Sequence, residues 1–77
     1  MNKQRREILQ SILNRIEKVI SDIESARDDE QEFYDNIPEN LRDSHMGQAA
    51  EEAIASMDDA LSSLDDAFTA IETAMGG

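Results

Sequence analysis

The sequence predicts an all-α fold, a long antiparallel two-helix hairpin with coiled-coil-like packing that dimerises into a four-helix bundle. Two apolar stripes and one break between them lead to this prediction. A seven-residue repeat of two acids, an alanine and two large apolar residues starts at Glu51, and a stripe spaced by three and four residues runs from Leu9 to Ile37. Both patterns keep large apolar side chains on one face of a helix. Pro38 separates them, because it disfavours a helical conformation of the residue before it.

The first helix is expected over residues 3–35. Its main stripe is widened by Leu13, Ile20 and Tyr34 to roughly 100°, which is the arc of a core-facing helix in a bundle. A segment rich in turn-forming residues follows the helix. The linker is therefore expected over residues 36–44.

The second helix is expected over residues 45–75. Ser44 is a favourable N-cap residue, and Gly47 lies in the first turn, where a glycine costs least. The Gly76-Gly77 pair ends the helix, because glycine readily adopts the backbone conformation that follows a helix C-terminus. Each helix is then about 45–50 Å long at 1.5 Å per residue, and residues 1–77 form one hairpin domain.

A symmetric linker sets an antiparallel register in which the numbers of facing residues add up to about 80. Arg27 then lies near Glu51 and Glu52, and Arg15 and Lys18 lie near other acids of the second helix. The alanines of the repeat are expected beside the seam, where small side chains let two helices approach closely. These alanines are Ala53, Ala60, Ala67 and Ala74.

Charge is distributed unevenly along the chain, whose formal net charge is −11. Residues 1–27 hold six basic and four acidic side chains, whereas residues 28–77 hold one basic and fourteen acidic side chains. Nucleic acids and anionic membranes are therefore poor partners, and a protein with a basic surface is the expected one. The simpler alternative is that the acids only keep a small protein soluble. The candidate contacts are Glu51, Glu52, Asp58, Asp59, Asp65 and Asp66.

Aromatic and apolar residues around the linker form a second candidate surface for partner binding, at the tip of the hairpin. Aromatic residues and methionine are enriched in protein interfaces. The alternative is that these residues close a small local core around Ile37. The hairpin-tip patch consists of Phe33, Tyr34, Leu41 and Met46.

No residue pattern predicts catalysis, a metal site or a cofactor. The chain has no cysteine, His45 is its only histidine, and no nucleophile–base arrangement is visible. The acids around the linker do not follow the spacing of an EF-hand. No segment approaches the ~20 apolar residues of a membrane span, and no apolar signal-peptide region follows the basic N-terminus. We therefore expect a soluble, non-enzymatic protein of the bacterial cytoplasm.

The segment DDEQEFYDNIPENLRDSHMGQAAEEA at residues 28–53 joins an acidic run and an aromatic pair to a Pro-Glu linker and a Ser-x-x-Gly helix start. The residues of this pattern are Asp29, Glu30, Gln31, Glu32, Phe33, Tyr34, Asp35, Asn36, Ile37, Pro38, Glu39, Leu41, Ser44 and Gly47. With the acidic heptads that follow, the segment resembles a family of small acidic helical proteins that is widespread in bacteriophage, prophage and Firmicute genomes. The resemblance implies a helical hairpin and a phage-related context, and it supplies no catalytic residues.

Together these observations predict a non-enzymatic accessory protein of phage or prophage type that presents an acidic helical surface to a basic site on a host protein. It would act as a nucleic-acid mimic or as an inhibitor of a host defence or nucleic-acid enzyme. The alternative is a structural or oligomerisation module whose apolar seam is the functional surface. Because a 100° stripe is wider than a two-helix seam needs, a homodimer is expected. A monomer that awaits a different protein is the competing prediction.

Overall fold

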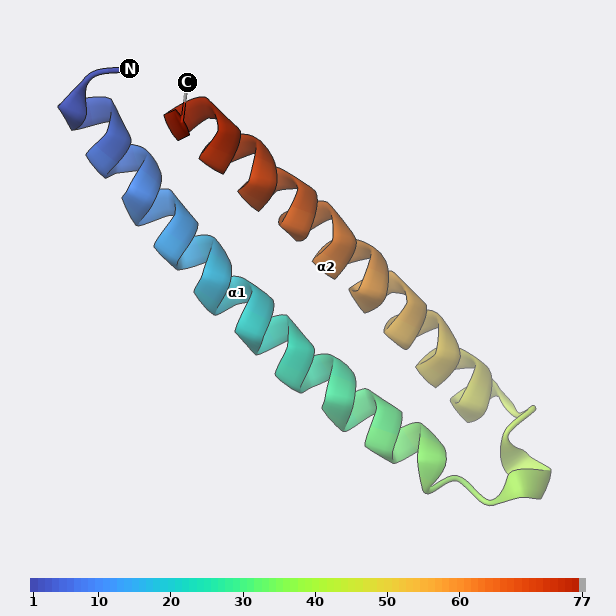
Figure 1. Cartoon of the computed structure of the whole chain (residues 1–77). Coiled ribbons are helices and arrows are strands. Elements are labelled where there is room, and N and C mark those ends of the chain that lie inside the picture. Colours follow the sequence, from blue (N-terminus) through green and yellow to red (C-terminus); the bar gives the residue numbers. More distant parts are fainter. Residues whose placement is uncertain (77) are drawn as a thin grey trace.

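The computed structural model describes residues 1–76 and shows two long helices that lie side by side in opposite directions (Figure 1). Helix α1 spans Lys3–Asp35, helix α2 spans His45–Gly76, and a short 3₁₀-helix, η1, lies between them at Glu39–Leu41. The described chain measures 58 × 15 × 13 Å and has its N- and C-terminal ends together, opposite the linker (Figure 1). The all-α antiparallel hairpin that the sequence predicts is confirmed.

Local sequence determines where α1 starts and stops. Asn2 is its N-cap, and the Oδ1 atom of Asn2 accepts a hydrogen bond of 2.8 Å from the backbone N–H of Arg5. At the other end, the backbone N–H of Ile37 donates to the carbonyl of Tyr34 at 3.1 Å. Pro38 follows and has no N–H to continue the ladder, so the chain leaves the helix there.

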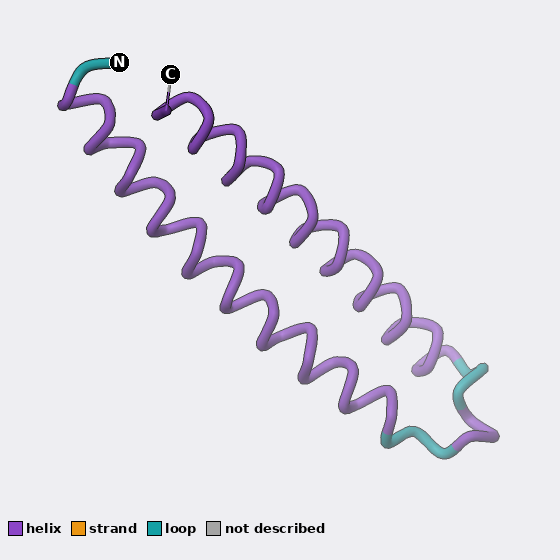
Figure 2. The backbone as a smooth tube through the Cα atoms, viewed as in Figure 1, coloured by secondary structure: helices purple, strands orange, loops and turns teal. Residues whose placement is uncertain are grey.

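The linker is a succession of tight turns that ends against the first turn of α2 (Figure 2). The backbone N–H of Leu41 donates to the carbonyl of Pro38 at 2.8 Å, and the N–H of Ser44 donates to the carbonyl of Leu41 at 3.1 Å. Gly47 is buried, and a Cβ atom on it would lie 2.7 Å from the carbonyl carbon of Arg42 and closer still to its oxygen. The glycine in the first turn of α2 is therefore required by the close approach of the linker backbone.

The register of the two helices differs from the predicted one by about five residues, or roughly 7.5 Å along the axis. Arg27 bonds to Asp58 and Tyr34 bonds to Glu51, and in both pairs the residue numbers add up to 85. The prediction that Arg27 lies near Glu51 and Glu52 is therefore wrong. The reason is that the linker does not turn symmetrically: it passes beyond the end of α1 and covers the first turn of α2.

The predicted contacts between the basic residues of α1 and the acids of α2 also change with this register. Lys18 pairs with Asp22 of its own helix at 3.4 Å, four residues further along. Arg15 instead lines an apolar groove on the hairpin surface. Arg27 is thus the basic residue of α1 for which the described chain shows an ion pair with α2.

The core of the hairpin is a single seam of apolar residues at heptad spacing, with few deeply buried members. Leu13, Ile37 and Ala50 are the buried apolar residues within residues 1–76, at 1–5% exposure, and Gly47 is buried with them. The other large seam residues remain half-buried, because two helices cannot enclose a seam from all sides. The residues of α1 that form the seam are Leu9, Leu13, Ile16, Ile20, Ile23, Arg27, Glu30 and Tyr34, and Ile37 extends the seam into the linker. Those of α2 are Gly47, Ala50, Ile54, Met57, Leu61, Leu64, Phe68, Ile71 and Met75.

Candidate protein-binding surfaces

The seam separates two long sides of the hairpin surface, one with acidic and the other with apolar side chains next to the seam. In an antiparallel pair of helices, the positions that flank the seam face each other across it, one set on each side. One side contains Glu17 and Asp65, which border a shallow groove together with Ile20 and Phe68. The other side contains Val19, which borders a groove together with further apolar residues. We call the first the acidic side and the second the apolar side.

The acidic side is formed by the first acid of each heptad of α2 and by the α1 residues that face these acids across the seam. Glu17 and Glu24 of α1 are exposed on this side. Both contributions are acidic or uncharged, so like charges lie along the seam with little compensation. The residues of the acidic side are Gln10, Glu17, Glu24, Gln31, Glu51, Asp58, Asp65 and Glu72.

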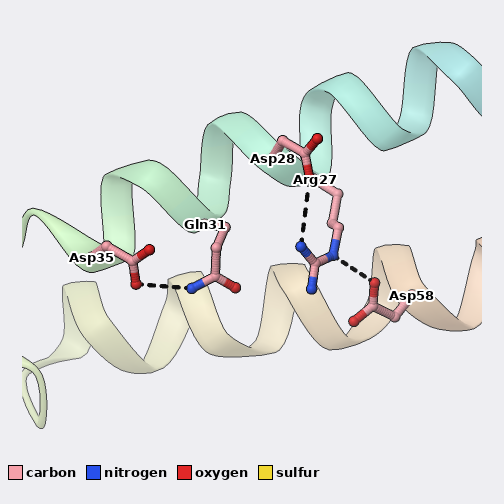
Figure 3. A network of polar contacts seen from close by, with 5 residues as sticks. All are labelled: Arg27, Asp28, Gln31, Asp35 and Asp58. Carbon is pink, nitrogen blue, oxygen red and sulfur yellow. Dashed lines mark hydrogen bonds and ion pairs between the residues drawn. The ribbon is translucent and has the colours of Figure 1, made fainter.

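Arg27 is the basic residue that lies in the seam next to these carboxylates (Figure 3). Its Nε atom donates to Oδ1 of Asp58 at 2.8 Å, and its Nη1 lies 3.5 Å from Oδ1 of Asp28. The hydrogen bond to Asp58 raises the pKa of Arg27 above its usual value, and its side chain is 31% exposed. Arg27 therefore ties one predicted contact residue of α2 to α1.

The spacing of the sequence contains a signal for this role of Arg27, which the prediction did not use. Arg27 lies seven residues after Ile20 and seven before Tyr34, so it occupies a seam position of α1. A cation at such a position needs a carboxylate partner from the facing helix. Asp58 is that partner in the structure.

Tyr34 and Glu51 form the second polar contact across the seam. The hydroxyl of Tyr34 donates to Oε1 of Glu51 at 2.6 Å, which raises the pKa of the Tyr34 hydroxyl above its usual value of 10.0. The guanidinium of Arg42 lies 5.7 Å from the centre of the Tyr34 ring, at a cation–π distance. One residue of the predicted hairpin-tip patch and one of the predicted acidic contacts thus bind each other.

This contact predicts a distinctive titration of the single tyrosine in the chain, which contains no tryptophan. Replacing Glu51 with glutamine removes the charged acceptor, so the pKa of Tyr34 is expected to fall towards 10.0. Because the folded state holds the proton more tightly than the unfolded state, the contact stabilises the fold below pH 10 and is lost as the pH rises through the folded pKa. Tyrosinate absorbance between pH 8 and pH 12 measures the shift. Equal titrations of the wild type and Glu51→Gln would contradict it.

The remaining predicted acidic contacts are exposed and bind nothing in α1. Glu52, Asp59 and Asp66 lie on an outward row of α2, and their side chains make no hydrogen bond or ion pair within residues 1–76. Asp65 is exposed beside the groove of the acidic side. Of the six acids that the sequence singles out, two are therefore fixed against α1 and four point to solvent.

Surplus negative charge is concentrated in one half of the hairpin. Residues 1–20 and 65–76 face each other in the observed register and hold five basic and five acidic side chains. We call these two segments the terminal half. Residues 21–64, the linker half, hold two basic and thirteen acidic side chains, so this half accounts for the whole net charge of −11.

The apolar side collects the large apolar residues that the seam does not bury. Ile8, Val19, Phe33 and Met46 all lie on this side and are 44–54% exposed. The hairpin-tip patch is thus divided, since Phe33 and Met46 face the apolar side while Tyr34 faces the acidic one. A local core closed by these residues around Ile37 is wrong, because Ile37 is buried but Leu41 in η1 is 45% exposed, as are Phe33 and Met46 to a similar extent.

The alanine row of α2 borders the apolar side as well. Ala53 is half-buried, but Ala60, Ala67 and Ala74 are exposed. The prediction that these alanines bring the two helices of the hairpin close together is therefore wrong beyond Ala53. They form instead a flat strip beside the half-exposed residues of α1.

No protein-family model, curated protein or solved structure matches this chain. Within residues 1–76, no three His, Asp or Glu side chains are arranged to hold a metal ion. Neither helix of that part of the chain combines the length and the apolar composition that crossing a membrane would need.

Proposed function

We propose that the protein is a non-enzymatic binding protein of phage or prophage type, which presents the carboxylates of its linker half to a basic site on a host protein. The observation that supports this function is the concentration of the entire charge of −11 in residues 21–64, while the terminal half is neutral. An acidic coat needed only for solubility has no reason to be confined to one end of the hairpin.

The charge density of the linker half is comparable to that of a nucleic acid. Half of the 58 Å hairpin is about 29 Å long, and double-stranded DNA of that length has about 17 phosphate charges. The linker half reaches roughly two-thirds of this density with a net charge of −11. A basic groove built for a phosphate backbone would therefore attract it. This supports a nucleic-acid mimic that inhibits a host defence or nucleic-acid enzyme.

We propose a narrower set of contact residues than the six acids that the sequence singles out. Glu52 and Asp59 lie in the linker half with unbound carboxylates, and Glu51 and Asp58 lie beside them with carboxylates held in place by α1. Fixed acceptors lose less conformational entropy when a partner binds. The exposed acids near the C-terminus belong to the terminal half, where basic residues of α1 offset their charge.

Charge reversal in the two halves tests this function directly. The double variant Glu52→Lys and Asp59→Lys is expected to weaken partner binding at least tenfold, because it removes exposed carboxylates of the linker half. The matched control is Asp66→Lys and Glu72→Lys, which changes the net charge equally at exposed positions of the same helix. Quantitative capture from host lysate, followed by titration of the captured protein at 50 and 200 mM salt, measures both.

The control is expected to retain most of the binding and most of its salt dependence. Equal losses in the two variants would show that only total charge matters, and would contradict the assignment to the linker half. Wild-type affinity in the Glu52→Lys and Asp59→Lys variant would exclude the acidic surface altogether. Circular dichroism of each variant shows that the helices remain formed.

A structural or oligomerisation module is the second candidate function, and one observation favours it. Four large apolar residues of the apolar side remain about half exposed, and apolar side chains gathered on one exposed side can mark an interaction site. Under this function, substitutions on the apolar side abolish the biological activity while charge reversal leaves it intact.

A further inference from the structure

We infer that a second copy of this chain covers the apolar side, in the antiparallel orientation, to form a four-helix bundle. This surface is distinct from the carboxylates of the linker half that we assign to partner binding. Ile8, Val19 and Phe33 extend the surface along most of α1, and Met46 extends it to the start of α2. The rest of α2 contributes the strip of exposed alanines.

The exposed area of the hairpin matches what such a dimer requires. The chain exposes 5549 Å² in the structure. A compact monomer of 8.6 kDa is expected to expose about 4,700 Å². The excess of roughly 850 Å² is close to the ~800 Å² that each partner contributes to an interface of standard size.

The shape of the apolar side suits another helix. A groove that is open to solvent is lined by four apolar residues and one arginine: Ile12, Ile16, Val19, Leu64 and Arg15. A large apolar side chain of the second copy fits against its apolar residues. The adjacent row of α2 is made of alanines, so a neighbouring helix can approach it closely. In the antiparallel orientation, a two-fold axis places each α1 against the α1 of the partner and each α2 against the partner's α2. The large residues of the two α1 helices then meet, and the alanine strips of the two α2 helices approach closely.

Charge selects the antiparallel orientation. A parallel dimer would place two linker halves side by side. Each has a net charge of −11, so the two halves would repel each other. In the antiparallel dimer, each linker half lies beside the neutral terminal half of the partner. Charged residues at the rim of the apolar side change in the same direction along the hairpin. Arg15 lies at the end near the chain termini, and Asp22 and Asp29 continue the same row of α1 towards the linker.

Sedimentation equilibrium of the full chain tests the dimer. The wild type is expected to sediment at about twice its monomer mass of 8.6 kDa. Val19→Glu places a charge in the centre of the apolar side and is expected to weaken the dimer at least tenfold. Ser25→Glu is the matched control, since it adds the same charge to an exposed position of α1 away from that side. Circular dichroism verifies that both variants stay helical, as expected for substitutions of exposed residues.

A wild type that sediments as a monomer at 100 μM would overturn the inference, and so would a Val19→Glu variant that dimerises as well as Ser25→Glu. The orientation is measured separately. The chain has no cysteine, so Asn40→Cys in η1 places one spin label at each tip. Labels separated by about 50 Å, near the 58 Å length of the hairpin, support the antiparallel dimer. A separation below about 25 Å would overturn it in favour of a parallel pair.

Discussion

Replacing Gly47 with alanine is expected to lower the melting temperature of the protein by about 10–20 °C. The added Cβ atom would lie 2.7 Å from the carbonyl carbon of Arg42, and the oxygen of that carbonyl would be nearer still. Both obstacles are backbone atoms, so the linker must move as a whole. Overpacking of this kind costs about 2–3 kcal/mol, and each kcal/mol corresponds to about 4–8 °C in a chain of this size. Thermal denaturation followed by circular dichroism measures the change.

Gly76→Ala is the matched control for this prediction. Gly76 is also a helical glycine of α2, but a Cβ atom on it would meet nothing within 4 Å. Alanine has the higher helix propensity, so this variant is expected to melt at the wild-type temperature or slightly above it. If Gly47→Ala and Gly76→Ala melted alike, the linker would not pack against the first turn of α2 as the structure shows.

Gly47 also explains why the register could not be predicted from the sequence. The spacing of three, four and seven residues was sufficient to predict two helices, because the period of the apolar residues is a local property. The register depends on the path of the linker, and that path is set by tertiary contacts. Ile37 is buried, the turns through η1 take the chain past the end of α1, and the backbone of Arg42 packs on Gly47. The burial of Ile37 fits the spacing of the stripe, but the turns through η1 and the packing of Arg42 on Gly47 have no periodic signal.

The candidate surfaces were predictable to a similar extent. The six acids of α2 are exposed, as their position off the seam suggests. The α1 residues predicted to face them were wrong, because the 100° stripe of α1 offers two overlapping seams. The structure uses Leu13 and Ile20, which leaves Val19 and Phe33 on the surface. The division into an acidic and an apolar side follows from which seam is used. The packing of the two helices against each other decides this, and the spacing of the sequence does not.

Replacing Leu13 with alanine is expected to destabilise the protein by about 2–4 kcal/mol, or about 10–25 °C in melting temperature. Leu13 is 4% exposed and is the one buried residue of α1, so few other contacts compensate for its loss. Alanine keeps the helix propensity high, which confines the effect to packing. Urea denaturation followed by circular dichroism measures the free energy of unfolding.

Ile8→Ala is the matched control, and it also separates the packing of the hairpin from that of the dimer. Ile8 lies on α1 five residues before Leu13 but is 54% exposed, so its truncation costs little in a single hairpin. At concentrations where the proposed dimer dissociates, Ile8→Ala is expected to unfold like the wild type, whereas Leu13→Ala loses its stability at every concentration. At concentrations where the dimer forms, Ile8→Ala becomes less stable than the wild type, because only then is its side chain covered. An Ile8→Ala variant as unstable as Leu13→Ala in dilute solution would show that α1 packs through the other seam.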